Sequence, residues 1–152
     1  MRYREMKLAD LFAVAELERK IFKDPWSVSS CRGAMENPCV YAVTAEDEED
    51  GKIAGYGFLM GTQDEAELLR IAVDPEKRRR HIGSELLEDM LDYADYEGYT
   101  AIFLEVRDGN TAAKALYEKS GFEPIGKRAD YYKDPVEDAL IMELLIEDPD
   151  DE

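Results

Sequence analysis

The segment from residue 67 to residue 106 constrains the fold more than any other part of the sequence. Two apolar stretches of strand length, 67–73 and 100–106, flank a segment in which apolar residues recur at intervals of three and four. That spacing is typical of an amphipathic helix, and the opposite face is acidic. A strand, a helix and a strand in this order predict a β-α-β unit. The apolar stripe of the helix consists of Ile82, Leu86, Leu87, Met90, Leu91 and Ala94.

Similar patterns extend this unit in both directions and predict an α+β fold with a β-α-β-α-β centre. Two helical patterns precede the unit, and its first strand is the last strand of an antiparallel meander. A further helix and two strands follow the unit. Ser27 and Asn110 are expected N-caps, and Gly98 and Gly121 are expected just after helix ends. Tyr131 and Tyr132 are expected in the connection between the last two strands. The expected strands are 2–5, 40–44, 52–60, 67–73, 100–106, 122–128 and 139–146, and the expected helices are 11–22, 28–35, 83–97 and 111–120.

The charge of the chain is strongly negative. Its 36 Asp and Glu residues against 19 Lys and Arg residues give a formal net charge of −17. This balance argues against nucleic acid as a partner, because binding a phosphate backbone needs a basic stripe. Two runs carry much of the excess, residues 46–50 and 147–152, and we expect both to be solvated. The length predicts one domain, residues 1–146, followed by an acidic, disordered tail at 147–152.

Other features indicate a cytoplasmic protein without a membrane span. No apolar stretch approaches the roughly 18 residues needed to cross a bilayer. Charges throughout the first ten residues argue against a signal peptide. Cys31 and Cys39 are too few for a disulfide framework and lack the spacing of metal ligands, so we expect no metal.

Four consecutive cations, Lys77 to Arg80, contradict the acidic average. They stand between the strand 67–73 and the helix that begins near Gly83. A helix N-terminus offers unpaired N–H groups and a partial positive charge, which suit a phosphate, and arginine adds charge-assisted hydrogen bonds. One interpretation is therefore an anion-binding loop. The alternative is a solvated basic loop.

The residues from Val73 to Leu87 resemble the acetyl-coenzyme-A signature of the GNAT family of N-acetyltransferases. That signature is Arg/Gln-x-x-Gly-x-Gly/Ala and starts here at Arg78. The resemblance covers nearly the whole chain. Within the family, the sequence is similar to the branch that acetylates the N-terminal alanine of ribosomal proteins. It implies an α/β/α sandwich, with a mixed sheet of six to seven strands and four helices. The further matching segments are 24–27, 104–107, Asn110 with 115–118, 120–122, 131–132, 137–139 and Met142.

His81 departs from this pattern, because it occupies the position of the first glycine in the signature. If that position needs a left-handed backbone, a residue other than glycine costs about 1–2 kcal/mol. Histidine tolerates the conformation better than most residues. We expect His81 to keep the loop geometry with its ring pointing outward. The alternative is a distorted loop that binds the cofactor weakly.

The resemblance implies a set of residues that bind acetyl-coenzyme A. The end of the strand 67–73 would pair with the pantetheine arm, and the loop with the start of the next helix would hold the pyrophosphate. Asn110 would contact the cofactor, although a simple N-cap explains it equally well. The expected cofactor-binding residues are Ile71, Ala72, Val73, Arg79, Arg80, His81, Ile82, Gly83, Ser84 and Asn110.

Glu105 and Tyr117 are the expected catalytic residues. Glu105 interrupts an apolar strand near its carboxyl end, where it could accept a proton from the substrate ammonium. The alternative is a charge at a frayed strand end, paired with an arginine. The resemblance places Tyr117 beside the cofactor sulfur as an acid, whereas its spacing alone indicates a core aromatic. Trp26, Tyr131 and Tyr132 are candidate walls of a peptide groove or, alternatively, packing residues.

The expected function is transfer of acetyl to a protein N-terminal α-amine, in particular the N-terminal alanine of a small-subunit ribosomal protein. The negative chain would attract such a basic partner. The alternatives are the same chemistry on a small-molecule or lysine amine, and a coenzyme-A-binding module without catalysis. The oligomeric state is left open.

Overall fold

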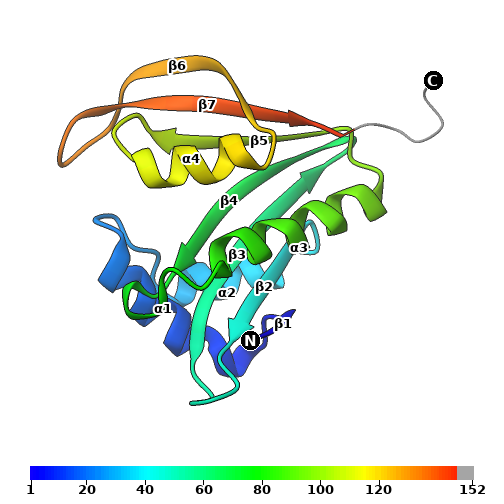
Figure 1. The fold of residues 1–152 in the computed structure, drawn as a ribbon, viewed down its shortest axis with the longest axis vertical. Coiled ribbons are helices and arrows are strands. Elements are labelled where there is room, and N and C mark those ends of the chain that lie inside the picture. The colour runs from blue at the N-terminus through cyan, green and yellow to red at the C-terminus, as the bar shows by residue number, and fades with distance from the viewer. Residues whose placement is uncertain (147–152) are drawn as a thin grey trace. The chain divides into compact units, whose positions relative to one another are not determined.

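A computed structural model describes residues 1–146 of the chain (Figure 1). The predicted tail at 147–152 lies outside the described residues. Within 1–146 the order of elements is the expected one, and no helix there has the length and apolar character needed to span a membrane. The elements are β1 (Arg2–Glu5), η1 (Leu8–Asp10), α1 (Leu11–Ile21), α2 (Val28–Glu36), β2 (Val40–Glu46), β3 (Ile53–Thr62), β4 (Glu65–Val73), η2 (Pro75–Lys77), α3 (Ile82–Glu97), β5 (Ala101–Arg107), α4 (Thr111–Lys119), β6 (Glu123–Tyr132) and β7 (Glu137–Leu145).

The described strands form one mixed sheet in the order β1-β2-β3-β4-β5-β7-β6. The pairs β1–β2 and β2–β3 are antiparallel, and the second of them is the hairpin expected at the start of the meander. Strand β5 pairs in parallel with β4 through Glu65–Glu67 and Ala101–Phe103, which confirms the predicted β-α-β unit. Strand β7 lies between β5 and β6 and is antiparallel to both. The sheet and the four α-helices agree with the expected fold class.

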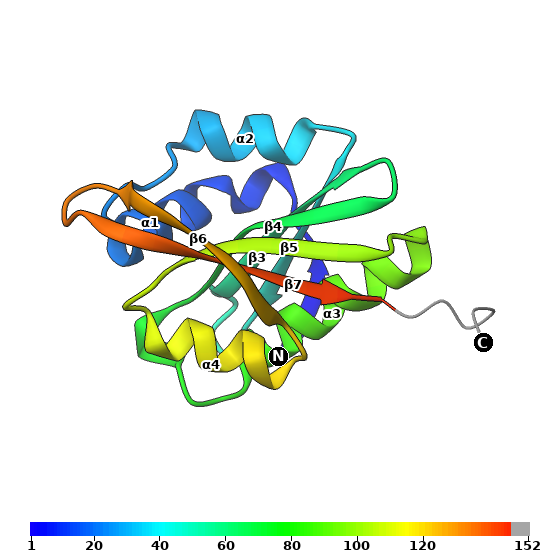
Figure 2. The ribbon, with the colours of Figure 1, turned by 90° about the horizontal axis from the view of Figure 1, so that it is seen from above.

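The chain forms two compact units, of which the first contains Met1–Met60 and Leu69–Asp92. In this unit α1 and α2 cover one face of the sheet and α3 covers the other (Figure 2). Tyr56 and Phe58 point into the core beneath α1 and α2, and both are fully buried. Gly55 and Gly57, which alternate with these two residues along β3, face α3. Alternation along β3 thus separates the two layers.

Gly55 lets β3 approach both its neighbouring strand and α3. A Cβ atom at this position would lie 2.8 Å from the carbonyl oxygen of Ala72 and 3.0 Å from Cδ1 of Leu86. The first of these atoms belongs to the backbone and cannot turn away. The Gly55→Ala substitution should therefore reduce the free energy of unfolding by about 1–3 kcal/mol, the usual range for overpacking.

Urea unfolding followed by circular dichroism measures this change. Gly33 is the matched control, because it lies inside α2 and a Cβ atom there meets nothing within 4 Å. Gly33→Ala should raise stability by up to about 1 kcal/mol, since alanine favours a helix more than glycine does. Equal effects of the two substitutions would contradict the assignment of Gly55 as a contact-limited position.

The second unit contains Gly61–Leu68 and residues 93–146. Its helix α4 begins at Asn110, whose side chain accepts a hydrogen bond from the N–H of Ala113 at 3.1 Å. Gly121 follows the helix with a φ of 104°, and Phe122 packs edge-on against Tyr117. These observations confirm the predicted cap and helix end.

One boundary in this unit differs from the expectation. Tyr131 and Tyr132, expected in a connection, are the last two residues of β6, because Tyr132 still pairs with Glu137 on β7. The ladder between β6 and β7 is irregular between Arg128 and Tyr132. Because of this irregularity, apolar and polar residues do not alternate regularly here, and that alternation is the pattern from which a strand is predicted.

Candidate active site

The basic loop, residues 77–81, connects η2 to the start of α3. Its residues Arg79 and His81 have left-handed backbones, with φ values of 71° and 61°. The position at which histidine replaces the signature glycine is therefore one that favours glycine, and His81 adopts the conformation with an exposed side chain. The carbonyl of His81 accepts the hydrogen bond of Glu85, which begins the helical ladder.

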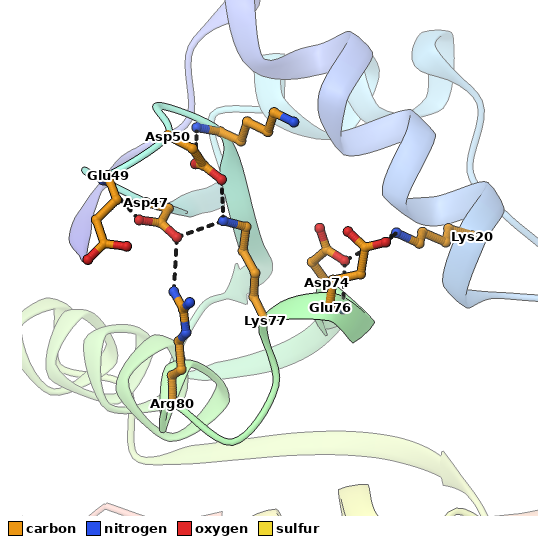
Figure 3. A network of polar contacts seen from close by, with 9 residues as sticks. Lys20, Asp47, Glu49, Asp50, Asp74, Glu76, Lys77 and Arg80 are labelled. Atoms are coloured by element: carbon orange, nitrogen blue, oxygen red, sulfur yellow. Dashed lines mark hydrogen bonds and ion pairs between the residues drawn. The ribbon is translucent and has the colours of Figure 1, made fainter.

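The basic loop is tied to the acidic turn, residues 46–50 (Figure 3). Nζ of Lys77 lies 2.6 Å from Oδ2 of Asp47 and 2.6 Å from Oδ2 of Asp50. Arg80 contacts the same Oδ2 of Asp47 at 3.0 Å. The expectation that the whole acidic turn is solvated is wrong for Asp47, which is only 4% exposed. Its burial follows from two cations that lie about 30 residues away in the sequence.

The other predicted cofactor residues of the first unit lie at the end of β4 and the start of α3. Ala72 and Ile82 are buried, and Ile71, Val73, Gly83 and Ser84 are half-buried. Arg78 and Arg79 are exposed and form no ion pair or hydrogen bond with the rest of residues 1–146. Two free arginines, left-handed backbone and the N-terminus of a sixteen-residue helix make this loop fit an anionic group such as a pyrophosphate.

Glu105 is one of two neighbouring carboxylates in the second unit. It lies on β5, and Glu67 lies on the adjacent part of β4, opposite Phe103. Because side chains alternate along a strand, Glu67 and Glu105 share a face of the sheet. Partial desolvation of its carboxyl and then the charge of Glu105 raise the pKa of Glu67, although the residue as a whole is exposed.

Two residues of β6 contact the Glu105 carboxylate. Nε of Arg128 lies 3.4 Å from Oε1 of Glu105. The interaction of the Tyr131 hydroxyl with the Glu105 carboxylate is the main reason that the pKa of Tyr131 is raised. The Arg128 guanidinium also lies over the Tyr131 ring, at 5.6 Å from its centre. Glu105 is therefore oriented by both partners, and the pairing with an arginine considered above is present.

Tyr117 is buried in the second unit, and this burial raises the pKa of its hydroxyl. A phenol with the ordinary pKa of about 10 is already protonated at neutral pH, and the raised pKa keeps Tyr117 in that form. Tyr132 lies under the Arg107 guanidinium, 4.3 Å from the ring centre, and Arg107 also binds the carbonyls of Lys133 and Pro135. Arg107 thus holds the hairpin that carries Tyr132.

Three residues of these clusters were missed by the sequence analysis: Asp47, Glu67 and Arg128. Glu67 is the first residue of an expected strand, where a charged residue is common and does not by itself indicate a functional role. Only the register between β4 and β5 brings it to Glu105. Within residues 1–146 no group of three or more His, Cys, Asp or Glu side chains is arranged to hold a metal ion.

Comparisons with known proteins agree on one family. The model of the acetyltransferase (GNAT) family matches residues 7–122. The ribosomal protein bS18-alanine N-acetyltransferase of Escherichia coli K12 is 36% identical over 143 residues, which cover 93% of this chain and 95% of the relative. The N-alpha-acetyltransferase RimI of Mycobacterium tuberculosis is 35% identical over 147 residues, covering 93% and 90%. The crystal structure of the Escherichia coli ribosomal-protein-S18-alanine N-acetyltransferase superposes with a TM-score of 0.89 at 34% identity, covering 97% and 94%.

The mixed sheet in the order β1-β2-β3-β4-β5-β7-β6, with its β-α-β unit, agrees with the acyltransferase fold that the sequence predicts. The chain belongs to the acetyltransferase (GNAT) family. It is accordingly an N-acetyltransferase, and its family uses acetyl-coenzyme A as the acetyl donor.

Proposed function

We propose that this enzyme acetylates the α-amine of a protein N-terminus, in particular the N-terminal alanine of a small-subunit ribosomal protein. The observation that carries the proposal is the similarity, over more than nine-tenths of both chains, to an enzyme named for that reaction. The net charge of −17 supports a basic protein partner, because opposite charge accelerates encounter.

The residues expected to bind acetyl-coenzyme A fall into three groups. Backbone groups of Ile71–Val73 hold its pantetheine arm, and residues 79–84 hold its pyrophosphate through the α3 N-terminus. The side-chain oxygen of Asn110 caps α4, which leaves its amide group free to donate a hydrogen bond to the cofactor. The cap and the cofactor contact are therefore compatible.

Glu105 and Tyr117 would move the two protons of the reaction. The Glu105 carboxylate accepts a proton from the substrate ammonium, whose pKa of about 7.7–8.0 makes the task modest. The amine nitrogen then forms a bond to the thioester carbon as the carbon–sulfur bond breaks, and the second amine proton leaves the nitrogen as the amide forms, which replaces the proton that Tyr117 gives to the sulfur. The buried Tyr117 hydroxyl donates its proton to the departing thiolate. Tyr131 and Arg128 keep the Glu105 carboxylate in one orientation.

Release of free thiol from acetyl-coenzyme A tests this function. The panel contains ribosomal N-terminal peptides beginning with Ala, Ser or Met, together with a lysine peptide with a blocked N-terminus and spermidine. The Ala peptide should show the highest kcat/KM, by about tenfold or more over the Met peptide, since a small pocket discriminates added methylenes to that extent. Release with spermidine alone would show that the peptide assignment is wrong. Cofactor binding without thiol release from any amine would indicate a non-catalytic module.

A further inference from the structure

We propose that Asp47 is a positioning residue for the cofactor: it holds the basic loop in its binding shape before coenzyme A arrives. This inference rests on the function proposed above, because it concerns the same pyrophosphate loop. It goes beyond that function by assigning a role to the acidic turn, residues 46–50, which contains none of the expected binding residues.

Asp47 is fixed from three sides. Its backbone N–H donates to the carbonyl of Lys52 at 2.8 Å, and its carbonyl accepts from Gly51 at 2.7 Å. Its Oδ1 accepts a hydrogen bond from the N–H of Glu49 at 3.0 Å. This arrangement leaves Oδ2 to face the basic loop. Asp47 is therefore a rigid acceptor, built by the turn between β2 and β3.

The two contacts of Oδ2 span the basic loop. Lys77 lies at its start and Arg80 near its end, so one oxygen atom ties together residues three apart (Figure 3). The Lys77 side chain is only 11% exposed and contacts Asp50 as well. Before the loop, Lys20 of α1 holds Asp74 at 3.3 Å. The segment that leads into α3 is thus held at three points.

The contacts of Asp47 with Lys77 and Arg80, called the tie below, act on a strained backbone. Arg79 and His81 both have left-handed φ values, and such conformations persist where the surrounding structure imposes them. Without the tie, the loop would relax into other conformations. The apparent affinity for a ligand falls in proportion to the fraction of molecules that retain the binding conformation.

The tie also divides the four cations of the loop into two that are paired with Asp47 and two that are not. Lys77 and Arg80 face Asp47, whereas Arg78 and Arg79 are exposed and form no ion pair within residues 1–146. The lowering of the Asp47 pKa to about 2, caused first by the hydrogen bond from Lys77, keeps its carboxylate charged at any pH at which the enzyme would work. The tie is therefore permanent rather than a pH switch.

The test is binding of coenzyme A by calorimetry to the full chain and to Asp47→Asn. We expect a Kd about tenfold higher for the variant, which corresponds to about 1.4 kcal/mol. KM for acetyl-coenzyme A should rise similarly, while kcat at saturating cofactor should change less than twofold. Asp47→Glu should recover part of the affinity. A second variant, Lys77→Met, removes the tie from the other side and should act in the same direction.

Glu49→Gln is the matched control, because it removes the same charge from the same turn without breaking the tie. It should leave Kd unchanged. An unchanged or lower Kd in Asp47→Asn would overturn the inference, since it would show that Asp47 competes with the cofactor or is indifferent to it. Failure of the wild-type chain to bind coenzyme A would instead contradict the proposed function.

Hydrogen exchange of the free protein measures whether Asp47 holds the basic loop in the absence of any ligand. Amides of residues 78–83 should exchange faster in Asp47→Asn than in the wild type or in Glu49→Gln. Amides of α4, which carries no residue in contact with Asp47, should not change in any of the three proteins. Unchanged exchange in residues 78–83 would show that the loop holds its shape without Asp47.

Discussion

Replacement of Glu105 by glutamine should lower kcat/KM for a peptide amine about 10²- to 10⁴-fold at neutral pH, the usual contribution of a general base. Glutamine keeps the shape of the side chain and retains a carbonyl oxygen that can face Arg128 and Tyr131, but it cannot take up a proton. Stopped thiol-release assays at saturating acetyl-coenzyme A measure the change.

The pH dependence separates a proton acceptor from a merely structural residue. The substrate α-amine deprotonates on its own near pH 8, so the deficit of Glu105→Gln should shrink as the pH rises above that value. Glu123→Gln, an exposed change on β6, is the control and should retain wild-type rates. A wild-type rate for Glu105→Gln at pH 7, or a deficit that is the same at every pH, would contradict the assigned role.

Replacement of Glu18 by alanine should produce the largest loss of stability, about 3–5 kcal/mol, because it breaks a buried charge pair by removing one partner. Glu18 lies on α1 and is fully buried. Its Oε1 accepts hydrogen bonds from the N–H of Trp26 at 2.9 Å and from Nε of Arg70 at 3.3 Å. Its Oε2 accepts a short hydrogen bond from the Tyr56 hydroxyl.

Loss of Glu18 would also release the segment between α1 and α2. Arg70 stacks on Phe22 at 4.1 Å and on Trp26 at 5.0 Å, and it donates to the carbonyl of Asp24 at 2.9 Å. With Glu18 absent, the Arg70 charge keeps no carboxylate partner in this network. Fluorescence of Trp26, the single tryptophan of the chain, reports both unfolding and the local change.

Glu16→Ala is the matched control for Glu18→Ala. Glu16 lies on the same helix and is exposed, so its replacement should alter the free energy of unfolding by no more than about 0.5 kcal/mol. Urea unfolding of both variants gives the comparison. A cost below about 1 kcal/mol for Glu18→Ala would show that the buried pair contributes little beyond its own desolvation.

Helix ends and the central β-α-β unit could be predicted from the sequence because local chemistry determines them. Ser27 and Asn110 cap their helices with hydrogen bonds to residues three positions later. Gly98 and Gly121 have the positive φ values that helix ends of this kind require. At His81 the sequence left open whether the signature glycine position needs a left-handed backbone, and the φ of 61° shows that it does.

The burial of Glu18 and its partners could not be predicted from local sequence patterns. Its position in the sequence of α1 is compatible with a surface salt bridge as much as with burial. The two side chains that hold it, Tyr56 and Arg70, lie 38 and 52 residues further along the chain. A periodic pattern gives the direction of a side chain relative to its own helix, but not the identity of what lies opposite.

The sequence by itself determined the family, the order of the elements and the presence of two opposite charged runs. Only the tertiary structure decided that these runs meet: Asp47 is buried between Lys77 and Arg80, and two of the four cations are engaged before any ligand binds. Likewise, only the register of β4 against β5 placed Glu67 beside Glu105. The physical reason is that capping, turn formation and periodicity act over a few residues, whereas the pairing of charges depends on which distant segments the sheet brings together.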